Sequence, residues 1–153
     1  MLATGAIAGH PVVDVRCIVY DGKHHSVDSK DIAFATAGKK AFMAAVREAR
    51  PIVLEPIVNL EVHCQADKMG DIAGDLSSRR GQVTGTQTLS AGALAVIGTA
   101  PLAELDGYGS RLKAVTGGHG SYTMALARYE QAPPNVQQQL ATEYAKHRRH
   151  EED

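Results

Sequence analysis

The hydrophobic periodicity of residues 55–132 constrains the fold more than any other feature of the sequence. Apolar and polar residues alternate over Ile57–Cys64, apolar residues recur at helical spacing over Ala66–Gly81, and two further alternating runs follow. The order of predicted elements is strand, helix, strand, strand, helix, strand. This order predicts a ferredoxin-like domain, in which a four-stranded antiparallel sheet carries both helices on one face.

Residues at the ends of the two predicted helices support their bounds. Arg79 and Arg80 fall in the last turn of the first helix, where positive charge is favoured, and Gly81 follows as a left-handed stop. The second helix is predicted as one continuous element that begins at Pro101 and ends at a pair of glycines. The strands are predicted at Ile57–Cys64, Gln82–Leu89, Leu94–Thr99 and Ser121–Tyr129.

Residues 1–54 contain too few predicted elements to bury both faces of a sheet. Alternation over Pro11–Tyr20 predicts a strand with one buried face, and a helix is predicted from its N-cap at Asp28 to Pro51, which stops it. The apolar stripe expected on this helix consists of Phe34, Ala37, Ala41 and Ala45. The first unit is thus a strand-helix-strand piece that is either incomplete or docked on its neighbour, and the whole chain is predicted to be α+β.

Composition excludes several classes of protein. The 153 residues carry a formal net charge of −1, so the chain has no overall basic field, and contact with nucleic acid would depend on local placement of Lys, Arg and His. Cys17 and Cys64 lie in predicted strands without a C-x-x-C spacing, which favours buried free thiols in a reducing compartment, the cytoplasm. The sequence shows no targeting segment and no apolar run of membrane-spanning length.

Five segments of the chain follow one another in an order that one protein family shares. They are AGHPVVDVRCIVYDGKHHSVDSKDIAF, PIVLEPI, MGDIAGDLSSRRGQVTG, PLAELDGYGSRLKAVTGGHGSYTM and YEQAPPNVQQQL. Together they resemble the C-terminal part of bacterial elongation factor G. The resemblance implies a partial domain IV with a ribosomal protein S5 domain 2-like fold in residues 1–54, a ferredoxin-like domain V in residues 55–132, and a C-terminal helix with a charged tail in residues 133–153.

The resemblance also implies a function in protein synthesis. In elongation factor G the tip of domain IV enters the decoding centre during translocation, and the resemblance maps a tip loop onto Lys23–Ser29, with His25 on the contacting histidine. The residues expected to contact RNA or the ribosome are Lys23, His24, His25, Asp28, Ser29, Arg79, Arg80 and His119. The implied partners are the ribosome with its RNA, the transfer RNA and messenger RNA at the decoding centre, and ribosomal proteins near the factor-binding site. The chain is expected to be a monomer.

Several of these residues also have simpler interpretations. Asp28 can cap its helix and shape the tip loop at the same time. Arg79 and Arg80 either satisfy the last carbonyl groups of their helix or contact ribosomal RNA or protein. The family typically has glutamine and arginine where this chain has Gly117 and His119, so a permanent charge is lost there, which points to a divergent, elongation factor G-like branch.

The chain contains no G-x-x-x-x-G-K-[ST] segment, so it lacks the usual phosphate cradle for GTP. We therefore expect no GTP hydrolysis and no cofactor in this chain. By resemblance, GTP and Mg²⁺ would bind in a separate upstream domain of the parent factor.

Three rival functions compete with this interpretation. A metal site is disfavoured because His24 and His25 are adjacent, while His63 and Cys64 point to opposite faces of one strand. A hydrolase that uses His25 as a general base oriented by Asp28 lacks a recognisable nucleophile context such as G-x-S-x-G. The remaining alternative is a stand-alone ferredoxin-like module that binds RNA or a small molecule. An RNA-binding sheet would need aromatic side chains on its open face, and the last strand offers only Tyr122 and Tyr129, which are expected on opposite faces.

Overall fold

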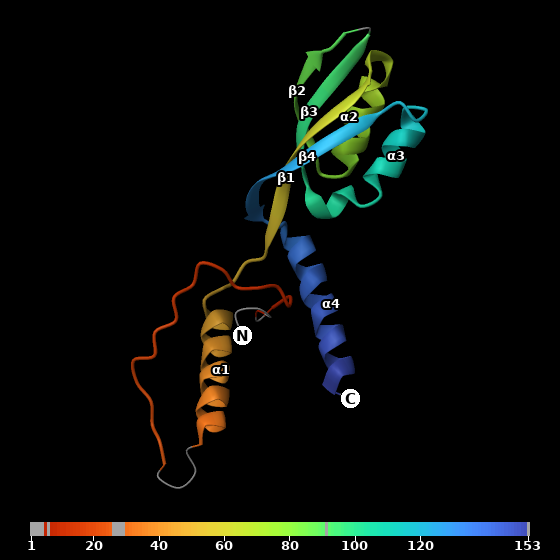
Figure 1. Ribbon diagram of the computed structural model, residues 1–153. Coiled ribbons are helices and arrows are strands. Elements are labelled where there is room, and N and C mark those ends of the chain that lie inside the picture. Colours follow the sequence, from red (N-terminus) through yellow and green to blue (C-terminus); the bar gives the residue numbers. More distant parts are fainter. Residues whose placement is uncertain (1–4, 6, 26–29, 91, 153) are drawn as a thin grey trace. The chain divides into compact units, whose positions relative to one another are not determined.

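A four-stranded antiparallel sheet with two helices on one face forms the unit Leu54–Gln131, hereafter the sheet unit, in the computed structural model (Figure 1). The structure describes residues 5, 7–25, 30–90 and 92–152, with residues 148–152 described by backbone alone. The strands are β1 (Leu54–Gln65), β2 (Gln82–Thr88), β3 (Ala93–Pro101) and β4 (Ser121–Gln131). Their order across the sheet is β2-β3-β1-β4, which confirms the predicted ferredoxin-like arrangement.

The core of the sheet unit lies between the sheet and its helices. Leu60 and Val62 of β1 are 1% and 0% exposed, and they pack with side chains from α2 (Met69–Ser78) and α3 (Tyr108–Val115). A short 3-10 helix, η1 (Ala66–Lys68), leads from β1 into α2. The buried cluster consists of Val58, Leu60, Val62, Cys64, Ile72, Leu76, Val96, Ala100, Leu105, Tyr108 and Leu112. Since both helices contribute to one cluster, they cover the same face of the sheet.

The end of α2 differs from the prediction, because the left-handed residue is Arg80 (φ 57°) and not Gly81. The Gly81 N–H donates to the Leu76 carbonyl at 2.7 Å, and the Arg80 N–H donates to the Ser77 carbonyl at 3.2 Å. These two bonds form a Schellman motif in which a non-glycine residue takes the left-handed position. Gly81 is needed for a different reason: a Cβ there would lie 2.8 Å from the Leu76 carbonyl oxygen.

The second predicted helix is two elements instead of one. A 3-10 helix, η2 (Leu102–Leu105), follows Pro101, which itself ends β3, and α3 begins only after a break at Asp106 and Gly107. Gly107 has φ 66°, a conformation that glycine adopts at little steric cost and that interrupts the helical hydrogen bonding. The break turns Tyr108 into the core, where it is 1% exposed, and leaves Leu102 41% exposed.

The remaining described residues form a second unit, hereafter the helical unit, drawn from Met1–Val53 and Ala132–Asp153. Its first helix is α1 (Asp31–Glu48), which is capped by Lys30 without a side-chain hydrogen bond. The predicted cap Asp28 lies outside the described residues. The predicted apolar stripe is exposed, and the half-buried side chains of α1 are those of Phe42, Met43 and Val46.

The strand predicted over Pro11–Tyr20 is wrong for this chain. The segment forms no strand, and its apolar side chains other than that of the half-buried Val12 are exposed, as Val13 (61%) and Ile18 (68%) show. Cys17, predicted to be buried, is exposed as well, whereas Cys64 is buried as predicted. The physical reason is that a strand needs a neighbour to pair its backbone groups, and alternation alone does not supply one.

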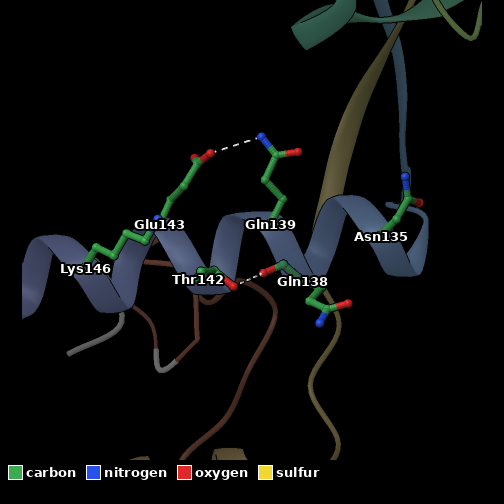
Figure 2. A pocket seen from close by; sticks show the side chains of 6 residues that line it. All are labelled: Asn135, Gln138, Gln139, Thr142, Glu143 and Lys146. Atoms are coloured by element: carbon green, nitrogen blue, oxygen red, sulfur yellow. Dashed lines mark hydrogen bonds between the residues drawn. The ribbon is translucent and has the colours of Figure 1, made fainter.

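The second helix of the helical unit is α4 (Pro134–Glu152), which follows β4 after Ala132 and Pro133. Val136, Leu140 and Tyr144 form a half-buried stripe along it at helical spacing. Its exposed polar face borders a shallow depression lined by Asn135, Gln138, Gln139, Thr142, Glu143 and Lys146 (Figure 2). Because one helix supplies all six side chains, the depression has no opposing wall. No helix among the described residues has the length and apolar character required to cross a membrane.

Candidate nucleic-acid interface

The predicted tip loop is exposed where the structure describes it. Lys23, His24 and His25 are exposed and lie outside any helix or strand, in the segment that precedes α1. The Asp21 carboxylate accepts a hydrogen bond from the Gly22 N–H at 2.7 Å, immediately before these residues. The other two predicted tip residues, at positions 28 and 29, lie outside the described part of the chain. One cationic and two titratable side chains are thus accessible to a partner.

Arg79, a predicted ribosome contact, is held by atoms of the sheet unit itself. Its guanidinium donates to the Asp75 carboxylate at 3.2 Å and to the carbonyl oxygens of Glu104 and Asp106 at 2.6 and 3.2 Å. It also lies 5.5 Å from the centre of the Tyr108 ring, within the range of a cation–π interaction. The carbonyl groups that Arg79 satisfies belong to η2 and the break after it, and not to its own helix.

Arg80, the neighbouring predicted contact, is bound by two carboxylates. Its two terminal nitrogens donate to the Glu55 oxygens at 2.8 and 2.7 Å, and its Nε donates to Glu104 at 2.9 Å. The hydrogen bonds to Glu55 are the main cause of a pKa raised above the ordinary arginine value. Arg80 therefore ties the end of α2 to the start of β1 and to η2 with a bidentate ion pair.

His119 lies in the exposed turn between α3 and β4. The turn contains two left-handed glycines, Gly117 (φ 61°) and Gly118 (φ 88°), and it is locked by Thr116, which is 5% exposed. The Thr116 hydroxyl donates to the Leu112 carbonyl at 2.7 Å and accepts from the Gly120 N–H at 2.8 Å. The sequence reasoning identified the glycines but missed Thr116, although a threonine before paired glycines is a capping signal.

The predicted contact residues do not form one site. Arg80 binds Glu55, which lies at the start of strand β1. His119 lies two residues before Ser121, and Ser121 pairs with His63 near the end of β1. The arginines and His119 thus occupy opposite ends of the sheet unit. The residues from Lys23 to His25 belong to the helical unit.

Tyr108 was missed by the sequence reasoning, although it connects much of this region. Its ring meets that of Tyr122 edge to face, with centroids 5.0 Å apart and an interplanar angle of 80°. Burial, and after it the charge of Asp75, raises the pKa of Tyr108 to about 12. Its hydroxyl is buried and has no hydrogen-bond partner among the residues that the structure describes. The sequence signal that was overlooked is a tyrosine one turn before Leu112, on the same helical face.

The structure gives little support to the rival sites. Within residues 5, 7–25, 30–90 and 92–152, no three His, Cys, Asp or Glu side chains gather as a metal would require. Burial, followed by the negative charge of Asp67, raises the pKa of Cys64, which disfavours the reactive thiolate. Tyr122 packs against the core, and the opposite face of the sheet presents residues such as Asn59, Glu61 and Thr123. Asn59, Glu61 and Thr123 have no aromatic ring on which a base could stack, and His63, exposed on the same face, is hydrogen-bonded to the Glu61 carboxylate.

Comparison with known proteins identifies the family. Residues 52–140 match the family described as Elongation factor G C-terminus, and residues 1–50 match Elongation factor G, domain IV. An elongation factor G-like protein of Thermotoga maritima is 42% identical over 139 residues, which are 91% of this chain and 20% of that protein. A crystal structure of a protein from Thermus thermophilus superposes with a TM-score of 0.76 at 38% identity, over 95% of this chain and 22% of that one.

The chain thus spans about a fifth of the length of the relatives that it matches. The two matched regions are adjacent and in the order that the resemblance implied, and neither is a GTP-binding domain. Since one match alone covers more than half of the residues, the chain belongs to the elongation factor G family.

Proposed function

We propose that this chain is the ribosome-contacting C-terminal part of a translocation GTPase, and that its loop Lys23–Ser29 enters the decoding centre as transfer RNA and messenger RNA move. The supporting observation is the exposure of Lys23, His24 and His25 in a chain of the elongation factor G family. The loop acts as a steric block that prevents reverse movement of the transfer RNA and messenger RNA.

The chemistry of the loop suits contact with folded RNA. An imidazole can stack on an unpaired base or donate to a phosphate, and a lysine adds attraction without sequence specificity. His25 is the residue proposed to make the main contact, with Lys23 and His24 beside it. His119 is proposed to contact the ribosome separately, at the factor-binding region.

The arginines have a supporting function in this proposal. Arg79 and Arg80 are engaged with Asp75, Glu55 and Glu104, so they shape the end of α2 and the start of β1. Any contact that they make with ribosomal RNA would use guanidinium N–H groups that do not donate to these carboxylates. GTP and Mg²⁺ would be bound by an upstream domain of the intact factor, which acts in the cytoplasm as a monomer.

The proposal is tested in an intact elongation factor G-like protein whose C-terminal region is replaced by this chain. We expect His25→Ala to slow translocation by about 5-fold to 150-fold, the effect of losing one stacking contact of about 1–3 kcal/mol. Ribosome-stimulated GTP hydrolysis should stay near the unmodified rate. Rapid-mixing measurements of both steps decide the matter, and an equal fall in hydrolysis would refute the assignment of the tip.

A further inference from the structure

Gln137 makes a pair of hydrogen bonds that neither the sequence pattern nor the proposed tip contact explains. Its side-chain oxygen accepts from the Val53 N–H at 3.0 Å, and its side-chain nitrogen donates to the Ala132 carbonyl at 2.7 Å. The Ala132 N–H donates in turn to the Val53 carbonyl at 2.9 Å. Three bonds thus close a ring between Val53, Ala132 and the first turns of α4, all within the helical unit. We call this ring the clasp.

Both backbone partners are buried and depend on this side chain. Val53 is 9% exposed and Ala132 is 1% exposed, so water cannot easily replace the carboxamide. A carboxamide carries a donating NH₂ group and an accepting oxygen in a single plane, and this pair of partners requires one of each. A glutamate presents only acceptors when ionised, and a methionine of similar shape presents neither group.

The two backbone partners of Gln137 lie where the chain enters and leaves the sheet unit. Val53 immediately precedes β1, and Ala132 immediately follows β4, so they are the two points at which the chain passes between its two units. Farther along α4, Tyr144 lies against Gly9, where a Cβ would come within 2.7 Å of the tyrosine ring. One helix is therefore fixed at its start to both chain passages and in its third turn to the N-terminal segment.

We propose that Gln137 is a positioning residue whose hydrogen bonds make Val53, Ala132 and α4 move as one rigid body. A displacement of the chain at Val53 or at Ala132 is then transmitted through α4 to the segment around Gly9. The functional effect of the clasp rests on the proposed function, because the clasp would help the intact factor to hold its tip loop during translocation. The clasp itself is a property of this chain and is tested without a ribosome.

The first experiment measures amide hydrogen exchange on the full chain. In Gln137→Met we expect the Val53 amide to exchange at least about tenfold faster than in the wild type, because one buried hydrogen bond is lost. In Gln137→Glu the ionised carboxylate at pH 7 cannot donate to the Ala132 carbonyl. The carbonyl-carbon chemical shift of Ala132 should therefore move upfield at pH 7 and return toward the wild-type value near pH 4, where a protonated carboxyl, with an ordinary pKa of about 4.3, again donates. Rates are compared with the wild type at each pH.

Gln138→Met is the matched control, because Gln138 occupies the next position of the same helix and its side chain is exposed. It should leave the exchange of Val53 and Ala132 unchanged. Unchanged exchange in Gln137→Met, or equal acceleration in both methionine variants, would overturn the clasp, since the effect would then be absent or would come from helix propensity.

The second experiment uses the intact chimeric factor with its ribosome. Gln137→Met should slow translocation by about twofold to thirtyfold, the range expected when coupling changes by about 0.5–2 kcal/mol, with unchanged ribosome binding. If His25→Ala slows translocation and Gln137→Met does not, although exchange shows an open clasp, the transmission is refuted and the proposed function stands. If His25→Ala has no effect, the proposed function fails independently of the clasp.

Discussion

The sheet unit and the helical unit contain similar apolar patterns but bury them to very different extents. The buried core cluster lies entirely in the sheet unit, whereas α1 contains no buried residue and most apolar side chains of Pro11–Tyr20 are exposed. In the sheet unit every strand has a neighbour and the helices cover one face. The difference shows that an alternating pattern indicates only the capacity to form a strand, and that the partner decides whether burial follows.

The largest effect that would test this difference is loss of a core side chain from β1. Leu60→Ala should lower the free energy of unfolding of the sheet unit by about 3 kcal/mol, because a fully buried leucine leaves a cavity. Val15→Ala, in the alternating segment, should alter the free energy of unfolding of the helical unit by less than about 0.5 kcal/mol. Urea denaturation followed by far-ultraviolet circular dichroism measures both, and similar losses would mean that the segment is packed after all.

A smaller effect is expected at the ion pair that closes the sheet unit. Arg80→Ala should destabilise the unit by about 2 kcal/mol, less than for a fully buried pair, because Arg80 is 31% exposed while Glu55 is 11% exposed. A double-mutant cycle with Glu55→Gln measures the coupling of the two side chains. Arg111→Ala, which removes a more exposed arginine from Asp75, is the control. A cycle with no coupling would show that Arg80 is available to a partner.

The smallest effect concerns the buried hydroxyl of Tyr108 and appears only at high pH. Its pKa is raised to about 12 in the fold, against about 10 unfolded, so its contribution to stability is complete below pH 10 and is lost as pH rises through 12. By about pH 11 this loss should be about 1 kcal/mol relative to Tyr108→Phe. Denaturation of both proteins at pH 8 and pH 11 provides the comparison, and parallel losses would place the hydroxyl in contact with solvent.

The elements of the sheet unit could be predicted because local pattern and tertiary environment agree there. The alternation over Ile57–Cys64 is produced by one face that packs on the helices, and turn residues mark the strand ends. The segment Pro11–Tyr20 has the same alternation but no neighbouring strand in the described part of the chain, so the same rule failed there. No local pattern reports whether a partner strand is present.

Side-chain ties were the other feature that the sequence could not reveal. The left-handed Arg80 is bound by Glu55 and Glu104, which are far from it in the chain, and Arg79 donates to the Asp106 carbonyl at the break before α3. The general preference for glycine at the left-handed position predicted Gly81, whereas the left-handed residue is Arg80, one position earlier. The exposed tip residues Lys23 to His25 were named from family resemblance, since exposure by itself does not distinguish an RNA contact from a solvated turn.

The strand order delays completion of the sheet during synthesis. β1 is made first, yet both of its neighbours, β3 and β4, come later, and β4 is the last strand to leave the ribosome. At roughly 5–20 residues per second, the finished β1 waits several seconds for β4. During that interval the apolar face of β1 is covered by α2, and β3 pairs with only one of its two edges. A nascent chain arrested before Ser121 would therefore expose to chaperones the edge of β1 that β4 covers in the complete protein.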